Sequence, residues 1–283
     1  MRFDAPFALA SGLFTLGLLA AATAAQAQAS AFQPDPQRAP ETGSTWTYSK
    51  SNRDGSNAWT LVMHVVSPTH IEVVKTNRKA AYVEVHAQVD LATAMPVRLQ
   101  QWNLECGQRL PSVSAEGDTT DGRSTVRVHL AQGMRLAVQA PGPLHMWGFD
   151  LTGFALIAPY LRQPAAAFEL QFADPNQPGD GQPVKVAAAR FEPQGQGEVQ
   201  GQTATRYRLS GPLFGALEGS VWLSPKGELL QAEHGLRTST DWRDWKLTRQ
   251  KAERLDRIAW ERLKLQMQQH SASAQAGDPD CKG

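Results

Sequence analysis

Residues 145–150 (HMWGFD) hold the densest mixture of polar and aromatic side chains in the sequence, with His145, Trp147 and Asp150 directly before an apolar segment. An imidazole and a carboxylate that lie close together can act as base and acid, and an indole beside them can line the rim of a pocket. The plainer interpretation is a turn in which Asp150 caps a helix and Trp147 closes one end of the core. We favour the turn and keep the three residues as pocket-rim candidates.

Residues 241–246 (DWRDWK) set Asp241 and Asp244 beside two tryptophans. Paired carboxylates support acid–base catalysis. On a strand, however, successive side chains alternate between the two faces, so Asp244 and Trp245 would point in opposite directions. We therefore interpret this segment as an edge or terminal strand with aromatic contacts.

The seven histidines are scattered along the chain and form no metal-binding motif. The sequence also lacks the Gly-rich phosphate loop, the dinucleotide fingerprint, the calcium loop and the G-x-S-x-G turn. Several histidines fall on the polar side of predicted strands, where a solvated imidazole needs no ligand. The sequence therefore predicts no metal and no cofactor, and it offers no catalytic motif that would make the protein an enzyme.

Two cysteines, Cys106 and Cys281, are the only thiols. In an oxidising compartment an even number permits a disulfide, which would pin the C-terminal tail to the rest of the chain. The alternative is two unrelated thiols, because Cys281 lies in a polar tail. Their spacing resembles neither a metal site nor a C-x-x-C redox pair.

The first 29 residues have the order of a secretory signal peptide. Arg2 is followed by an apolar run over residues 7–25 and by small residues that predict cleavage after Ala27 or Ala29. The alternative is an uncut membrane anchor. No later stretch is apolar enough to span a bilayer, so we expect a periplasmic or secreted protein that is not integral to the membrane after cleavage. The 28 basic and 27 acidic residues nearly balance, which argues against nucleic acid as a partner.

The remaining chain is predicted to be mainly β, as a curved antiparallel sheet or half-open β-barrel with a short helical insertion and a C-terminal amphipathic helix. Residues 30–45 are polar and proline-rich and predict a linker. From 46 to 249 the apolar residues recur with period two, most clearly in 82–91 (YVEVHAQVDL), where one face is apolar and the other is predicted to be wet. The period breaks at about 149–162, which predicts the helical insertion, shortened or kinked by Pro159.

Residues 250–270 predict the final helix, with Leu255, Ile258, Ala259, Arg262 and Leu263 on one face. We expect this helix to pack on the sheet or its edge. Residues 271–283 are predicted to be a flexible tail.

The second half of the chain carries a resemblance. The segment 215–236 (GALEGSVWLSPKGELLQAEHGL), followed by 241–248 (DWRDWKLT), is similar to the ending of a broad set of exported bacterial proteins of unknown function. Such proteins resemble, in architecture, the half-open β-barrels of LolA- and LolB-type periplasmic lipoprotein carriers and of mycobacterial lipid carriers. The resemblance implies a curved sheet partly covered by helices that holds acyl chains, and it carries over no ligand residues.

We therefore consider three functions. The first is binding or carriage of a lipophilic ligand, such as a lipid or lipoprotein, in an apolar concavity. Its candidate lining residues are Trp59, Met63, Leu136, Phe154 and Leu161, for which ordinary core packing is the alternative. The second is a non-catalytic structural or interaction protein of the envelope, and the third is an enzyme whose site lies around His145 and Asp150.

Overall fold

The computed structural model describes residues 30–93, 95–131, 133–146, 151–174, 185–217, 219–235, 242, 244–276 and 281. The predicted signal peptide therefore lies outside the described residues. In the described part of the chain no helix is long and apolar enough to cross a membrane.

One sheet contains the strands of the described residues. In chain order they are β1 (Ser30–Ala31), β2 (Ser44–Asn52), β3 (Trp59–Ser67), β4 (His70–Asn77), β5 (Tyr82–Val89), β6 (Pro96–Glu105), β7 (Gln108–Thr120), β8 (Arg123–Leu130), β9 (Arg135–Pro141), β10 (Leu144–Met146), β11 (Phe168–Asp174), β12 (Lys185–Val199), β13 (Gln202–Ser210), β14 (Gly219–Leu223), β15 (Leu229–His234) and β16 (Trp245–Arg254). The helical elements are η1 (Pro36–Arg38), α1 (Thr152–Ile157), η3 (Ala158–Tyr160) and α2 (Arg257–Gln275).

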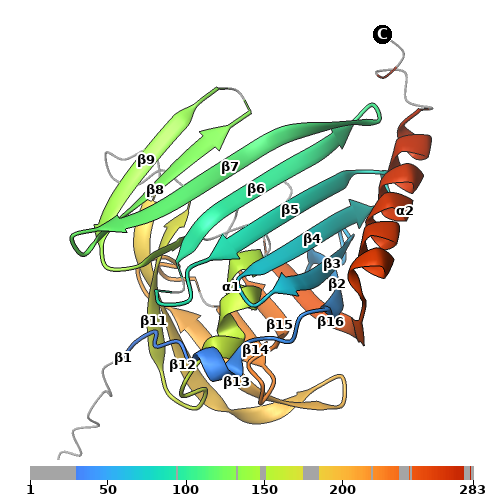
Figure 1. Cartoon of the computed structure of the whole chain (residues 1–283). Coiled ribbons are helices and arrows are strands. Elements are labelled where there is room, and N and C mark those ends of the chain that lie inside the picture. Colours follow the sequence, from blue (N-terminus) through green and yellow to red (C-terminus); the bar gives the residue numbers. More distant parts are fainter. Residues whose placement is uncertain are drawn as a thin grey trace, which may run out of the picture.

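The sheet runs in the order β1-β11-β12-β13-β14-β15-β16-β2-β3-β4-β5-β6-β7-β8-β9, and β10 pairs with β11 beside this path. Neighbours are antiparallel except where β1 and β10 meet β11. The sheet curls round α1 into a barrel, while α2 lies outside it (Figure 1). The barrel stays open at one seam because β9 ends the path on one side and β1 on the other. The predicted fold class is thereby confirmed.

The inner face of the barrel is packed around α1. Phe154, Ala155, Leu156 and Ile157 are all buried in one cluster with the inward side chains of the strands. Phe154 stacks on Phe191 of β12 with the ring centroids 5.2 Å apart. A helix that is apolar on every side is stable only when it is enclosed, which is why this short element lies inside the sheet.

The helical insertion is shorter than the predicted 149–162. The α-helix ends at Ile157 and a 3-10 turn follows over Ala158–Tyr160, because Pro159 lacks the amide proton that an α-helix needs. The helix begins after Leu151, which provides no side-chain cap. Asp150, the expected cap, lies outside the described residues.

Residues 30–45 differ from the predicted linker. Ser30 and Ala31 pair with β11, and the Asp35 amide donates to the Tyr160 carbonyl at 2.7 Å. The ring of Phe32 packs at an edge against Phe168, with the centroids 6.1 Å apart. The segment is held in place because its backbone groups form hydrogen bonds with β11 and with the turn after α1, and because the Phe32 ring packs on β11.

The C-terminal helix begins later and ends later than predicted. Residues up to Arg254 pair with β2 as part of β16, and the Asp256 carboxylate caps α2 by accepting from the Ala259 amide at 2.8 Å. The helix runs to Gln275, so part of the predicted tail is helical. Its sheet-facing side matches the predicted face only in part: Leu255 and Leu263 pack towards the sheet, but Trp260 is buried and Ile258 is 72% exposed.

Helix α2 covers the face of residues 82–91 that was predicted to be solvent-exposed. Tyr82 packs with Trp260, Val62, Val74 and Leu104 in a second cluster outside the barrel. The alternation of apolar and polar residues in β5 is as predicted, but the polar face is covered by α2, which comes from the C-terminal end of the chain. Cys281 is bonded to Cys106, at the turn after β6, which pins the end of the chain to the sheet.

Candidate functional site

The five predicted lining residues lie in or against one core. Met63, Phe154 and Leu161 are buried members of the interior cluster, and Trp59 and Leu136 are half-buried against it. All five therefore belong to, or pack against, the interior cluster. Their surroundings are the packed side chains around α1, which is the alternative that the sequence left open.

Of the three pocket-rim candidates, only His145 lies in the described residues. Its side chain is buried, at 4% exposure, and its ring lies 5.8 Å from that of Phe172 and 6.5 Å from that of Phe32. The interpretation of His145 as a rim residue is therefore wrong, because aromatic rings enclose it. Trp147 and Asp150 lie outside the described residues.

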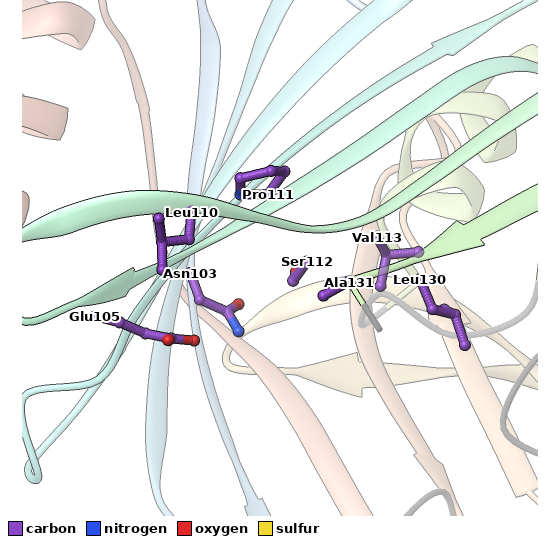
Figure 2. Close-up of a pocket in the computed structure, with 8 residues that line it drawn as sticks. All are labelled: Asn103, Glu105, Leu110, Pro111, Ser112, Val113, Leu130 and Ala131. Carbon is purple, nitrogen blue, oxygen red and sulfur yellow. The ribbon is translucent and has the colours of Figure 1, made fainter. Parts of the chain in front are cut away.

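A pocket of about 570 Å³ lies over β6, β7 and β8. The residues that line it are Asn103, Glu105, Leu110, Pro111, Ser112, Val113, Leu130 and Ala131 (Figure 2). Side chains of paired residues share a face of the sheet. Leu99 and Ala115 are paired and buried in the interior cluster. Side chains two residues apart on a strand point to the same face, so the next such pair, Gln101 and Val113, also faces inward.

The pocket therefore continues the inner face of the barrel beyond its packed part. Val113 pairs with Leu130, and both pack against the interior cluster at one end of the pocket. Leu110 is 39% exposed, and it pairs with Asn103. Because apolar side chains line one part of the pocket and an amide and a carboxylate line another, the pocket suits a molecule with an apolar body and a polar end.

The polar part of the pocket is held by hydrogen bonds between β6 and β7. The Gln101 amide donates to the Ser112 hydroxyl at 2.9 Å, and that hydroxyl donates to the Gln101 carbonyl at 3.3 Å. Ser112 is the extra residue of the β-bulge opposite Gln101 and Trp102. Bulges re-aim side chains and commonly occur beside binding sites.

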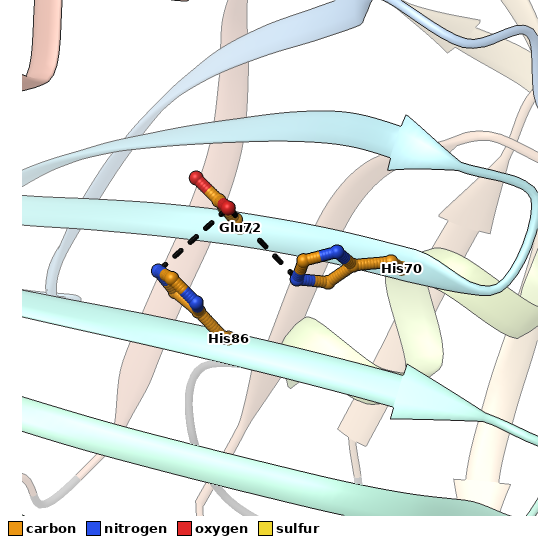
Figure 3. A group of neighbouring side chains, drawn as sticks. All are labelled: His70, Glu72 and His86. Atoms are coloured by element: carbon orange, nitrogen blue, oxygen red, sulfur yellow. Dashed lines mark ion pairs between the residues drawn. The ribbon is translucent and has the colours of Figure 1, made fainter. Parts of the chain in front are cut away.

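A second concentration of polar groups lies outside the barrel, under α2. Glu72 of β4 is paired with His86 of β5 on one side and with His64 of β3 on the other. His70 and Glu84 lie two residues along their strands and therefore share this face. Figure 3 shows the side chains of His70, Glu72 and His86 converging from two neighbouring strands.

The two oxygens of Glu72 have different partners. Oε2 accepts from the Trp260 indole and from the Lys264 ammonium, each at 2.7 Å. Oε1 lies 3.9 Å from Nε2 of His70 and 3.8 Å from Nε2 of His86. Burial opposes ionisation of this carboxyl, but the bonds from Lys264 and Trp260 outweigh it and leave its pKa below the ordinary value.

The two oxygens of Glu84 also have different partners. Its Oε2 lies 3.1 Å from Nε of Arg109 and 3.5 Å from the Tyr82 hydroxyl. Its Oε1 lies 2.7 Å from Nε2 of His86. Burial is again the largest influence and raises the pKa, but His86 and Arg109 together bring the pKa of Glu84 below its usual value.

The Lys264 ammonium is the centre of positive charge under α2. It lies 2.7 Å from Glu72, 3.1 Å from Glu261 and 3.7 Å from Glu84. Burial would favour the neutral amine, yet these carboxylates raise the pKa of Lys264. A charged lysine therefore ties the helix to both strands.

His64 of β3 is the next residue of this outer face, beside Glu72. The Thr45 hydroxyl donates to the Gly43 carbonyl at 3.0 Å, so Nδ1 of His64, 2.8 Å away, must be the donor to that hydroxyl. The His64 ring stacks on Trp260 with centroids 4.7 Å apart, and burial lowers its pKa. A cavity of about 800 Å³ opens here, lined among others by His64, His70 and Glu72.

Comparisons with known proteins assign the chain to no family: neither a protein-family profile nor a curated protein matches the sequence. Among solved structures, it is similar to a β-barrel-like protein of the domain of unknown function DUF1849 from Brucella abortus, with a TM-score of 0.47 and 9% identity over 75% of this chain and 98% of that one. It is also similar to a protein of presumed export with a YmcC-like fold from Bacteroides fragilis, with a TM-score of 0.32 and 10% identity over 80% of this chain and 100% of that one.

A DUF1329 family protein from Desulfovibrio piger matches with a TM-score of 0.23 and 8% identity over 77% of this chain and 88% of that one. At such identities and TM-scores, these likenesses carry no argument about function. The pockets and side chains of this chain are therefore the basis of its proposed function.

The outer cluster under α2 was not predicted from the sequence. The signal was present as His-x-Glu at 70–72 and Glu-x-His at 84–86, which places each pair on one face of a strand. Only the register of β4 against β5, which sets Glu72 opposite His86, makes one site of the two pairs. The interpretation as solvated imidazoles is wrong for His64, which is buried under α2, while His70 and His86 are half-buried.

Proposed function

We propose that this chain is an exported binding protein that carries a lipophilic molecule at the open end of its barrel. The observation that carries the proposal is the inner-face pocket over β6–β8, which extends the apolar interior to a partly polar opening. Its volume of about 570 Å³ is within the range of about 300–1,000 Å³ that small-molecule pockets occupy.

The lining suggests how such a ligand would lie. Val113 and Leu130, which pack against the interior cluster, would contact its apolar body. Asn103 and Ser112 would meet its polar end. The deeper interior is filled by α1, so the proposed binding place is the end of the concavity and not its centre.

The ligand class that we propose is a lipid or the acyl part of a lipoprotein, and the place of action is the periplasm or the exterior. Both follow from the predicted signal peptide and from the resemblance to lipoprotein carriers. The proposal treats the chain as a binding protein and not as an enzyme. A purely structural or interaction role in the envelope is the competing outcome.

The first test is organic extraction of the purified protein followed by mass spectrometry, together with binding of a dansyl-labelled fatty acid. Leu110→Glu places a charge at the pocket, while Leu265→Glu makes the same change on α2, where the side chain is 52% exposed. We expect Leu110→Glu to weaken probe binding by about tenfold or more, equal to at least about 1.4 kcal/mol. Leu265→Glu should leave it unchanged.

The competing outcomes are distinct. If no lipid is extracted and the parent protein does not bind the probe, the carrier proposal is wrong. If the two glutamate variants bind the probe alike, binding occurs elsewhere and the assignment of the pocket is wrong. Capture of an envelope protein by a parent chain that binds no lipid would instead favour the interaction role.

A further inference from the structure

We propose that His70, His86 and the facing oxygens of Glu72 and Glu84 form a binding site for a divalent transition-metal ion of the Zn²⁺ type. The site lies outside the barrel under α2, so it is separate from the lipid pocket and does not depend on it. Two imidazoles and two carboxylates form a donor set that suits zinc.

The first support is that the two oxygens of each carboxylate have different partners. Trp260 and Lys264 hold the outer oxygen of Glu72, and Arg109 and Tyr82 lie at the outer oxygen of Glu84. The remaining oxygen of each points to an imidazole nitrogen. Metal-binding carboxylates are typically oriented by such outer hydrogen bonds, which prevent them from turning away.

The second support is an imidazole nitrogen that makes no hydrogen bond. Nε2 of His70 is buried and has no hydrogen-bond partner in the described part of the chain. Its nearest charged atom is Oε1 of Glu72, at 3.9 Å, too far for a hydrogen bond. A buried polar atom without a partner costs free energy, and a metal ion between these two atoms would remove that cost.

The third support is spacing. Donor atoms of His70, Glu72 and His86 all lie within 4.8 Å of one another. In a tetrahedral zinc site with bonds of about 2.0–2.2 Å, neighbouring donor atoms are about 3.3–3.6 Å apart. The observed 3.8 and 3.9 Å therefore need to close by a few tenths of an ångström, and the 2.7 Å between Oε1 of Glu84 and Nε2 of His86 needs to lengthen by about 0.6–0.9 Å, which side-chain rotations provide.

The access to the site and the charge around it are also compatible with binding of a divalent metal ion. The adjoining cavity of about 800 Å³ reaches His70 and Glu72 from the N-terminal end of α2. Two carboxylates match the charge of a divalent ion, while the Lys264 ammonium, 2.7 Å from Oε2 of Glu72 and 3.7 Å from Oε1 of Glu84, opposes it. On binding, the ion takes the place of the proton between Nε2 of His86 and Glu84; that proton leaves to solvent, and the bound neutral imidazole carries its one proton on Nδ1.

The test uses the full chain, treated with a chelator, dialysed and titrated with Zn²⁺ in a calorimeter. We expect one ion per chain. His70→Ala and His86→Ala should each weaken binding by more than about tenfold, the lower end of what loss of even an outer-shell partner costs. His129→Ala, which changes an exposed histidine on β8, is the matched control and should bind as the parent does.

Lys264→Gln removes the opposing ammonium and should tighten binding. Imidazole resonances of the parent provide a readout that needs no variant: Zn²⁺ should shift those of His70 and His86 and leave that of His129 in place. If the parent binds no Zn²⁺, or if the resonances of His70 and His86 do not move, the site is an ion-pair network without a metal and the proposal is overturned. Equal binding by the parent and both alanine variants would overturn it as well.

Discussion

The indole nitrogen of Trp260 donates a 2.7 Å hydrogen bond to Oε2 of Glu72, and this bond ties α2 to β4 on the outside of the barrel. The indole also fills the apolar cluster between α2 and the sheet, where it is 1% exposed. One side chain thus provides apolar burial and a donor to a buried charge. This pairing explains why a helix with few apolar residues is held to the sheet.

Trp260→Phe should therefore lower the free energy of unfolding by about 1.5–3 kcal/mol, because a hydrogen bond to a charged group is lost from a buried place. Trp59→Phe is the matched control, since the half-buried Trp59 donates to the neutral amide of Asn57 at 2.9 Å. Its loss should be smaller, about 0.5–1.5 kcal/mol. Urea unfolding measures both, and an equal or larger loss in the control would contradict this account.

The bond between Cys106 and Cys281 should hold the last turns of α2 in place. Cys281→Ser is expected to lower the free energy of unfolding by about 2–5 kcal/mol, because it removes a constraint on the unfolded chain. Hydrogen exchange should rise near Gln275, whose amide donates to the carbonyls of Ala80 and Leu104. Two titratable thiols in the protein purified without a reductant would show that this bond is not formed.

Gly227 makes a close contact that no other residue type allows. It has φ of +82°, and a Cβ added there would lie 2.6 Å from the Ala158 carbonyl oxygen, beneath the turn that follows α1. Gly227→Ala should therefore cost the strain of the left-handed backbone, about 1–2 kcal/mol, and about 1–3 kcal/mol more for the clash.

Gly122→Ala separates these two effects. Gly122 has φ of +73°, but an added Cβ would meet nothing within 4 Å. Only the backbone strain is expected there. Chemical denaturation of both variants is the measurement, and equal losses would show that the turn after α1 moves aside without cost.

All four tyrosines of the chain are buried, and burial raises each pKa: to about 12 for Tyr160 and Tyr207, and further for Tyr48 and Tyr82. The unfolded chain loses these protons near the ordinary value of 10, whereas the folded chain keeps them. Stability should thus be complete below pH 10 and fall as pH rises from 10 towards 12.

Tyrosinate absorbance should accordingly appear together with the loss of near-ultraviolet circular dichroism, in one cooperative step. Tyrosines that titrate near pH 10 in a chain that keeps its circular dichroism would contradict their burial. Tyr207→Phe keeps the ring in the interior and removes one ionising group. It should move the alkaline transition to higher pH.

The period of apolar residues was enough to predict most of the sheet and the enclosed helix. Strand β5 has its apolar and polar faces where residues 82–91 placed them. Pro159 shortened α1 as its chemistry requires. Prediction was less accurate at the ends of elements, as in 250–254, because pairing with β2 is a contact with a distant part of the chain.

The sequence by itself determined the alternation of the strands, the apolar insertion and the two cysteines, because these depend on side-chain type and local spacing. Only the tertiary structure decided that the polar face of β5 is roofed by α2, that α1 fills the barrel and that Glu72 stands opposite His86. These are matters of register and packing between residues far apart in sequence. A strand pattern is the same whichever partner covers it, so the partner is chosen by the whole fold.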